Sequence, residues 1–351
     1  MKQRILFALA TISAAAMLTV SAHAKDLSGA GGTAIYPVLS QWADTYQKAT
    51  GTAVNYQAIG SGGGIKQIQA QTVDFANSDK PLKPEDLAAM NAVQFPMVVI
   101  SITPIVNLPG IKPGELTFDG KTLADIYLGK ITMWDSPEIK ALNPAVKLPH
   151  MAITTVHRSD GSGTTFNFTN YLGKVSPEWQ DKVGADVSVE WPNGVGGKGN
   201  AGVASSVQQV LGSIGYVEYA YVMENKLTYT KMKNKAGKTI EPTIAAFSAA
   251  AANADFTKVQ NFYLILTDQP GEKSWPITAA TFMLMRTDYP AAQNQPVLAF
   301  LDWALKHGQE QAKALDYVPL PPSVVQQVEA SWAQSFKAPD GKPVFSAMAA
   351  H

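Results

Sequence analysis

The sequence has no cysteine among its 351 residues. This excludes disulfide bonds, thiolate nucleophiles and cysteine-bearing zinc or iron–sulfur sites, although it still permits an oxidising compartment. Histidine is also scarce. His150, His157, His307 and His351 follow the N-terminal segment, and their spacing is not typical of metal ligands. We therefore expect neither a metal site nor a cofactor.

The sequence also has no net charge, because its 28 lysines and arginines balance its 28 aspartates and glutamates. Such a balance argues against a chain that coats nucleic acid or a membrane surface, so no nucleic-acid partner is expected. If the ligand is an anion, a local site must bind it. Internal repeats, low-complexity blocks and long linkers are not visible, and 46% hydrophobic content indicates a globular protein.

The N-terminus has the features of a secretory signal peptide. Lys2 and Arg4 precede an apolar stretch, and residues 22–24 (Ala-His-Ala) match a small-residue cleavage site. We expect residues 1–24 to be removed, giving an exported, soluble chain that begins at Lys25. An uncleaved membrane anchor is the alternative, because the apolar stretch approaches membrane-spanning length.

Removing that segment leaves 327 residues with 26 basic and 28 acidic side chains, a net charge of −2. A chain of this length is too long for one small core, so two lobes are expected. Apolar stretches at 98–108 and 275–285 are candidates for segments that pass between the lobes. Helical periodicity predicts further helices at 297–305 and 323–332.

Loops rich in glycine, serine and threonine precede predicted helices. Residues 28–33 lead into a helical face at 35–46, with Thr33 as a plausible N-cap. An alternating strand at 54–59 ends at a glycine-rich loop, after which Ile65 opens a short helix. The repeated strand–loop–helix order predicts an α/β fold with largely parallel pairing, in which ligands bind at the carboxyl ends of the strands.

A third such unit contains the most informative segment. A strand at 153–156 leads into residues 158–164 (Arg-Ser-Asp-Gly-Ser-Gly-Thr), and apolar residues at helical spacing follow over 168–175. Arg158 offers a planar fork of donors, and the glycines allow backbone N–H groups to approach an anion. Asp160 fits beside an anion only if something between them donates a hydrogen.

Each of these features also has an ordinary structural explanation. A glycine-rich loop before a helix is usually a turn with an N-cap, and Arg158 and Asp160 could form a surface ion pair. Asp79 could be a turn residue before Pro81. With three such loops, however, helix N-termini and the hydroxyls of four residues could bind a dehydrated anion together. These residues are Thr33, Ser61, Ser162 and Thr164.

Other motifs fail on their spacing. Ser162 lacks the flanking glycines of a nucleophile elbow, since positions 160 and 164 are Asp and Thr. Residues 194–199 resemble a phosphate-binding P-loop only superficially, and we expect a surface loop near the cleft there. A dinucleotide fingerprint at 29–34 lacks a clear preceding strand and an acidic ribose partner.

The chain resembles the periplasmic phosphate-binding protein of the bacterial phosphate ABC transporter over nearly its whole mature length. The segments that carry the resemblance are 28–33, 56–64, 73–79, 123–134, 158–164, 194–200 and 214–219. The resemblance implies a type II periplasmic-binding-protein fold with two lobes, each a central mixed sheet flanked by helices, joined by crossover strands. The implied division is a signal peptide at 1–24, lobe 1 at 25–106 and 276–351, and lobe 2 at 107–275.

The resemblance also implies the function and its site. The protein would bind inorganic phosphate in the periplasm without turnover and deliver it, as a monomer, to the permease subunits of the transporter. The implied phosphate-binding residues are Thr33, Ala34, Ser61, Asp79, Arg158, Asp160, Ser162, Gly163 and Thr164. Two positions depart from the family pattern. The family usually has an aromatic residue where this chain has Ala34, and a small residue where this chain has Lys80.

Phosphate differs from sulfate near neutral pH because it keeps at least one proton, which a buried carboxylate can accept. An unpaired buried charge costs roughly 1–3 kcal/mol or more, so sulfate would be rejected. We expect Asp160 above all, with Asp79, to test for this proton.

The alternatives to a phosphate-binding protein are a binding protein for another tetrahedral oxyanion such as sulfate, a secreted phosphatase or esterase with Ser162 or Thr33 as nucleophile, and a structural role.

Overall fold

The computed structural model describes residues 26–345. The predicted signal peptide at 1–24 and the start of the mature chain at Lys25 lie outside these residues. Within the described part of the chain, no helix is both long and apolar enough to cross a membrane.

The core of the molecule is a mixed sheet. Its order is β2 (Val54–Ala58), β1 (Leu27–Gly31), β3 (Phe75–Ser78), β12 (Thr278–Arg286), β4 (Ala92–Asn107), β8 (Ser213–Glu218), β6 (Thr154–Arg158) and β7 (Val195–Gly197), with β13 (Val318–Pro319) and β9 (Thr228–Tyr229) also on β4. The outer pairs β1–β2, β1–β3, β6–β7 and β6–β8 are parallel, as predicted. The central pairs made by β4 and β12 are antiparallel. A smaller sheet contains β11 (Thr239–Ile240), β10 (Lys231–Lys233) and β5 (Thr117–Phe118).

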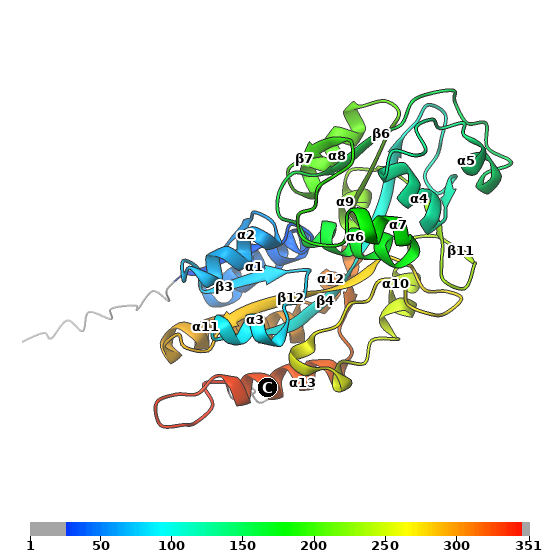
Figure 1. The fold of residues 1–351 in the computed structure, drawn as a ribbon. Helices are drawn as coiled ribbons and strands as arrows, with labels where there is room; N and C mark the ends of the chain where they lie inside the picture. Colours follow the sequence, from blue (N-terminus) through cyan, green and yellow to red (C-terminus); the bar gives the residue numbers. More distant parts are fainter. Residues whose placement is uncertain (1–25, 346–351) are drawn as a thin grey trace, which may run out of the picture.

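Strand β4 joins two sides of the molecule. Its residues 92–101 pair with β12, whereas residues 102–107 pair with β8. We call the part around β1, β2, β3 and β12 the β1 side, and the part around β6, β7 and β8 the β6 side. Figure 1 shows them as two bodies, with α1, α2, α3 and α11 on the β1 side and α4, α6, α7 and α8 on the β6 side. The predicted two-lobed α/β architecture is therefore confirmed, while the exact lobe boundaries stay a prediction.

Helices flank the sheet in both parts of the molecule. In chain order they are α1 (Tyr36–Thr50), α2 (Ser61–Gln69), α3 (Pro84–Ala89), α4 (Gly120–Tyr127), α5 (Pro137–Leu142), α6 (Gly163–Val175), α7 (Pro177–Lys182), α8 (Gly199–Gln209), α9 (Tyr219–Glu224), α10 (Ile244–Ala251), α11 (Ala291–His307), α12 (Gln309–Ala314) and α13 (Pro322–Ser335). Short 3₁₀ turns lie at Phe256–Lys258 and Gln260–Phe262. The helices predicted at 297–305 and 323–332 correspond to α11 and α13.

Helix α1 forms because its apolar residues face the sheet at helical spacing. Val38, Leu39 and Trp42 are buried, and the Trp42 indole N–H donates to the Gly308 carbonyl at 2.9 Å. Each fully buried large apolar side chain contributes about 1.5–3 kcal/mol. The predicted N-cap at Thr33 was wrong. Ile35 occupies the cap position, because the chain already turns there with φ −79° and ψ −15°.

The other two predicted loop–helix junctions lie close to their expected places. Helix α2 begins at Ser61, four residues before Ile65, because Gly60 makes the turn with φ +87°, a conformation that favours glycine. Helix α6 begins at Gly163, and Ser162 caps it, with its Oγ accepting from the Thr165 N–H at 3.0 Å.

Candidate functional site

The candidate site lies where the β1 side and the β6 side meet. The chain leaves β1, β2 and β3 at one edge of the β1 side and supplies Thr33, Ser61 and Asp79 there. It leaves β6 at Arg158 and enters α6 at Gly163. Carboxyl ends of strands and amino ends of helices thus converge on one place, which is where open α/β sheets bind ligands.

Asp79 is the buried acid of the β1 side. Only 1% of its surface is exposed, and its Oδ1 accepts from the Thr281 hydroxyl at 2.7 Å. Among residues 26–345, no group donates a hydrogen bond to its Oδ2. Burial raises the pKa of Asp79 from 3.8 to about 6, although the Thr281 hydrogen bond and the charge of Arg158 act in the opposite direction. This carboxyl group therefore keeps one acceptor atom for a donor outside the described chain.

Thr281 reaches Asp79 because β12 runs antiparallel to β3: Phe282 pairs with Ser78, which places Thr281 opposite Asp79. The same residue lies beside a bulge in the pairing of β12 with β4. Thr281 pairs with Val98 and Phe282 pairs with Pro96, so Met97 forms a bulge. Bulges change the direction of nearby side chains, and a proline without an N–H is tolerated beside one. The sequence gives no local signal for this contact, since Thr281 lies 202 residues from Asp79.

On the β6 side, Arg158 and Asp160 form a buried ion pair. The Arg158 Nε and Nη2 donate to the two oxygens of Asp160 at 2.8 and 2.6 Å, and the Gly199 N–H donates to the Asp160 Oδ1 at 2.9 Å. Burial raises the pKa of Asp160, but the hydrogen bonds and charge of Arg158 outweigh it, so the pKa stays below its usual range. Asp160 is thus an ionised partner that orients the arginine. The pair is not the exposed surface bridge that remained possible from the sequence.

The serine hydroxyls are arranged to donate toward a ligand. The Ser61 Oγ accepts from the Asp79 N–H at 3.2 Å, and the Ser162 Oγ accepts from the Thr165 N–H. Because a hydroxyl that accepts from an N–H still has its own proton, both serines can donate that proton to a further acceptor. The first turns of α2 and α6 add donors, since a helix leaves its first N–H groups without internal acceptors, although the Gly62 and Thr165 N–H groups already donate to the Gly161 carbonyl and the Ser162 Oγ.

The two sides are in direct contact around this site. The Gly62 N–H donates to the Gly161 carbonyl at 2.9 Å, and the Asn167 amide donates to the Asp79 carbonyl at 2.7 Å. Gly163 packs so tightly against the β1 side that a Cβ there would lie 2.5 Å from the Ser61 Oγ. The candidate residues are consequently buried, Arg158 with only 4% of its surface exposed, except for Asp160, which is half-buried.

Ala34 and Lys80, the two departures from the family pattern, have defined environments. Ala34 is fully buried, and its carbonyl accepts from the Tyr317 hydroxyl at 2.6 Å. The Lys80 ammonium lies 2.7 Å from the Asp186 Oδ1, across the boundary between the two sides, and 5.4 Å from the centre of the Phe166 ring. Lys80 therefore does not simply face solvent.

Residues 194–199 lie largely at the surface and adjoin the site, as expected, but the expectation that they form a loop was wrong for residues 195–197. Residues 195–197 form β7 beside β6, because Val156, His157 and Arg158 pair with them in parallel. This pairing brings the N-terminus of α8 into the site, where Asn200 is fully buried. Asn200 belongs to the segment 194–200 that carries the family resemblance, but the local sequence around it indicates no role.

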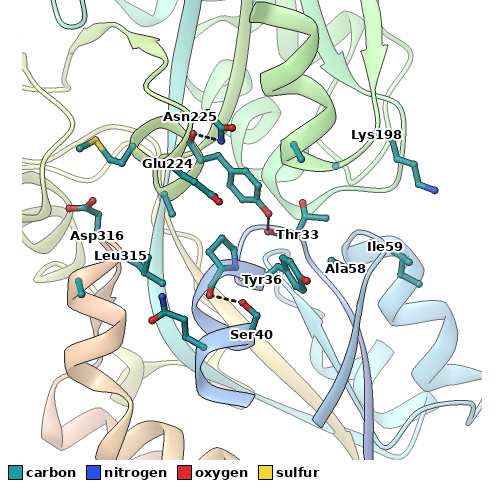
Figure 2. A pocket seen from close by; sticks show the side chains of 18 of the residues that line it. Thr33, Tyr36, Ser40, Ala58, Ile59, Lys198, Glu224, Asn225, Leu315 and Asp316 are labelled. Atoms are coloured by element: carbon teal, nitrogen blue, oxygen red, sulfur yellow. Dashed lines mark hydrogen bonds between the residues drawn. The ribbon is translucent and has the colours of Figure 1, made fainter. Parts of the chain in front are cut away.

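A groove of about 810 Å³ adjoins the site and shares Thr33, Asp160 and Gly199 with it. Figure 2 shows Tyr36 and Ser40 on one wall and Glu224 and Asn225 on the opposite wall, with Thr33 between them at the inner end. The Tyr221 hydroxyl donates to the Thr33 carbonyl at 2.7 Å, so the walls are connected there.

The alternative of a phosphatase or esterase gains no support from the position of Ser162. The Ser162 hydroxyl acts as a helix cap, and the nearby His157 ring stacks on Trp191 with 4.7 Å between ring centres. Over the described residues, no group of three or more His, Asp or Glu side chains is placed to hold a metal ion.

Comparison with known proteins identifies the family of the chain. A family model described as a PBP superfamily domain matches residues 18–307. The phosphate-binding protein PstS of Xylella fastidiosa (strain 9a5c) is 54% identical over 312 residues, covering 89% of this chain and 86% of the relative. The PstS protein of Haemophilus influenzae is 51% identical over 318 residues, covering 90% and 95%.

Among solved structures, the chain is similar to a high affinity periplasmic phosphate-binding protein (PfluDING) bound with phosphate. The TM-score is 0.72 at 20% identity, covering 93% of this chain and all of the other, and it supports the fold alone. The chain therefore belongs to the PBP superfamily and, within it, to the family of the PstS phosphate-binding proteins.

Proposed function

We propose that this protein binds inorganic phosphate and hands it on without chemical change. The observation that carries the proposal is the contrast between Asp79 and its surroundings. Hydroxyls, helix N-termini and one arginine supply donors, while the Asp79 Oδ2 is a buried acceptor to which no described residue donates. An anion that carries a proton satisfies both kinds of group. The PstS relatives support the same ligand.

The proposed ligand contacts come from Thr33, Ala34, Ser61, Asp79, Arg158, Asp160, Ser162, Gly163 and Thr164. Within this set we reassign the test for the ligand's proton from Asp160 to Asp79. Both oxygens of Asp160 already accept from Arg158, and its Oδ1 also accepts from Gly199, so its main role is to orient the guanidinium. Ala34 would contribute through its backbone.

Discrimination against sulfate follows from the Asp79 environment. Sulfate has no proton for the Oδ2, so binding it would bury a carboxyl group beside an anion without a hydrogen bond between them. Such a mismatch costs roughly 1–3 kcal/mol, which is about a 5- to 150-fold difference in Kd. Positive charge contributes little to the choice, because Asp160 offsets the charge of Arg158.

We infer that the two sides are the lobes of a binding protein that closes on its ligand. Residues 25–106 and 276–351 would form one lobe and residues 107–275 the other, with β4 and the segment before β12 as the connections. The Gly62–Gly161 and Asn167–Asp79 hydrogen bonds join the lobes and would form on closure. The closed, monomeric protein in the periplasm would then be recognised by the permease subunits of a phosphate ABC transporter.

Calorimetry of the phosphate-stripped protein against phosphate, arsenate and sulfate tests the proposal. We expect one phosphate per chain and a Kd for sulfate that is about 5- to 150-fold higher than that for phosphate. In competition, Asp79→Asn should let sulfate displace phosphate more readily, since an amide can donate where the carboxylate cannot, whereas Asp160→Asn should mainly weaken all anions. Absence of phosphate binding, or turnover of phosphate esters, would contradict the proposed function. Unchanged selectivity in Asp79→Asn would contradict only the role of Asp79.

A further inference from the structure

Asn200 is a buried side chain that contacts two of the candidate binding residues, Thr33 and Thr164. It is the second residue of α8, and none of its surface is exposed. Its Oδ1 accepts from the Glu218 N–H at 2.9 Å. Because a backbone N–H can only donate, this bond fixes the direction of the amide and turns the Nδ2 toward the site.

The Asn200 amide donates to two threonine hydroxyls. The distance from Nδ2 is 2.8 Å to the Thr33 Oγ1 and 3.4 Å to the Thr164 Oγ1. The Thr33 Oγ1 also accepts from the Asn200 backbone N–H at 3.2 Å, and the Thr164 Oγ1 also accepts from the Arg158 Nη1 at 3.4 Å.

Each threonine oxygen therefore accepts two hydrogen bonds. A hydroxyl has two lone pairs and one proton, so an oxygen that accepts twice can take part in a further hydrogen bond only as a donor. Neither threonine can then accept a proton from a ligand. Two hydroxyl acceptors are thereby removed from the site, which favours the Asp79 Oδ2, the buried carboxylate oxygen to which no described residue donates, as the acceptor of the ligand's own proton.

We propose that Asn200 is a positioning residue that commits Thr33 and Thr164 to donate to the bound anion. The inference rests on the proposed function, because it concerns the same ligand. It adds a link between specificity and closure. Thr33 belongs to the β1 side and Asn200 to the β6 side, so Thr33 becomes an obligatory donor only when the two sides are in contact.

A double-mutant cycle distinguishes this task from a structural one. Asn200→Ala should weaken phosphate binding by about 10- to 100-fold, the effect of one or two impaired hydrogen bonds to a charged group. In a Thr33→Val, Thr164→Val background, the same Asn200→Ala change should weaken the remaining binding by less than threefold. A residue that only stabilises the fold would lower affinity by the same factor in both backgrounds, and this result would overturn the proposal.

A second variant keeps the shape of the side chain. Asn200→Asp replaces the donor by an acceptor, so the threonine protons turn toward the carboxylate and phosphate affinity falls further than in Asn200→Ala. Equal or tighter binding than in Asn200→Ala would contradict the proposal. Asn234→Ala is the matched control: this buried asparagine also bonds several backbone groups of its own surroundings, including the Gly271 carbonyl at 3.0 Å, and its loss should leave the phosphate Kd unchanged.

The outcomes also separate this inference from the proposed function. If the wild-type protein, stripped of ligand, does not bind inorganic phosphate, the proposed function fails. If the wild type binds phosphate but the cycle shows no coupling between Asn200 and the threonines, only the role of Asn200 fails.

Discussion

A methyl group at position 163 should prevent the two sides from meeting. In Gly163→Ala, the added Cβ would lie 2.5 Å from the Ser61 Oγ, 2.6 Å from the Asp79 Cβ and 2.8 Å from the Asp79 nitrogen. Two of these atoms belong to the backbone or are attached directly to it, so turning a flexible side chain cannot relieve the contact. The sides must separate instead.

The required separation gives the size of the effect. Moving the nearest contact from 2.5 Å to the 3.4 Å at which ordinary van der Waals contact begins requires a shift of about 0.9 Å. The same shift lengthens the Asn167–Asp79 and Gly62–Gly161 hydrogen bonds from 2.7 and 2.9 Å beyond hydrogen-bonding distance. At about 1 kcal/mol each, with some loss of ligand contacts, closure weakens by about 2–3 kcal/mol, and the phosphate Kd rises roughly 30- to 150-fold.

Calorimetry on the stripped protein measures this Kd, and thermal unfolding shows whether the fold survives. The melting temperature of ligand-free Gly163→Ala should not fall, because alanine is the better helix former and the separated sides accommodate it. Gly173→Ala is the control in the same helix. Its Cβ would meet the Gln180 Oε1, the end of a flexible side chain, at 2.4 Å. A Kd for Gly163→Ala within threefold of wild type would refute the reasoning.

Two further predictions concern charge. Burial raises the pKa of Asp79 from 3.8 to about 6, so the folded protein holds this proton more tightly than the unfolded chain does. The free energy of unfolding should therefore fall by about 3 kcal/mol in total as the pH rises from about 3 to 7, with about 2 kcal/mol of this fall between about pH 4 and 6. Asp79→Asn should lose this part of the pH dependence in urea unfolding of ligand-free protein, and an unchanged slope would speak against it. Lys80→Met removes the partly exposed Lys80–Asp186 pair between the sides, so stopped-flow phosphate release should be about two- to fivefold faster at low salt and equal to wild type at high salt. A difference that persists at high salt would show that the charge pair is not responsible.

The parts of the site that are continuous in sequence were predictable. The order of residues 158–164 places a cation, an acid, hydroxyls and glycines before a helix, and the structure has α6 beginning there at Gly163. The apolar spacing after Ile35 likewise predicts the buried face of α1. These features depend on local periodicity and on helix capping, which a few neighbouring residues determine.

The remaining parts depend on contacts between distant segments. Thr281 is 202 residues from Asp79, and Asn200 is 167 residues from Thr33. A threonine within an apolar strand and an asparagine after a glycine-rich loop have no local pattern that assigns them a partner. Burial of the Arg158–Asp160 pair was equally hidden, because the same two residues on a surface would have the same sequence. Only the packing of the β1 side on the β6 side determines whether the pair is buried. The same packing determines that Asp79, and not Asp160, keeps an oxygen to which no described residue donates.

Strand β4 has a mechanical consequence. It continues through Ser101 and Ile102 from one set of neighbouring strands to the other without a break in its hydrogen bonding. A rotation of one side against the other must therefore twist β4 itself, because the crossing is a paired strand and not a flexible linker. In the binding cycle proposed above, a continuous paired strand would limit how far the two sides separate and would return them to the same alignment. Opening and closing would then require only a twist of β4, with no segment having to unfold and fold again.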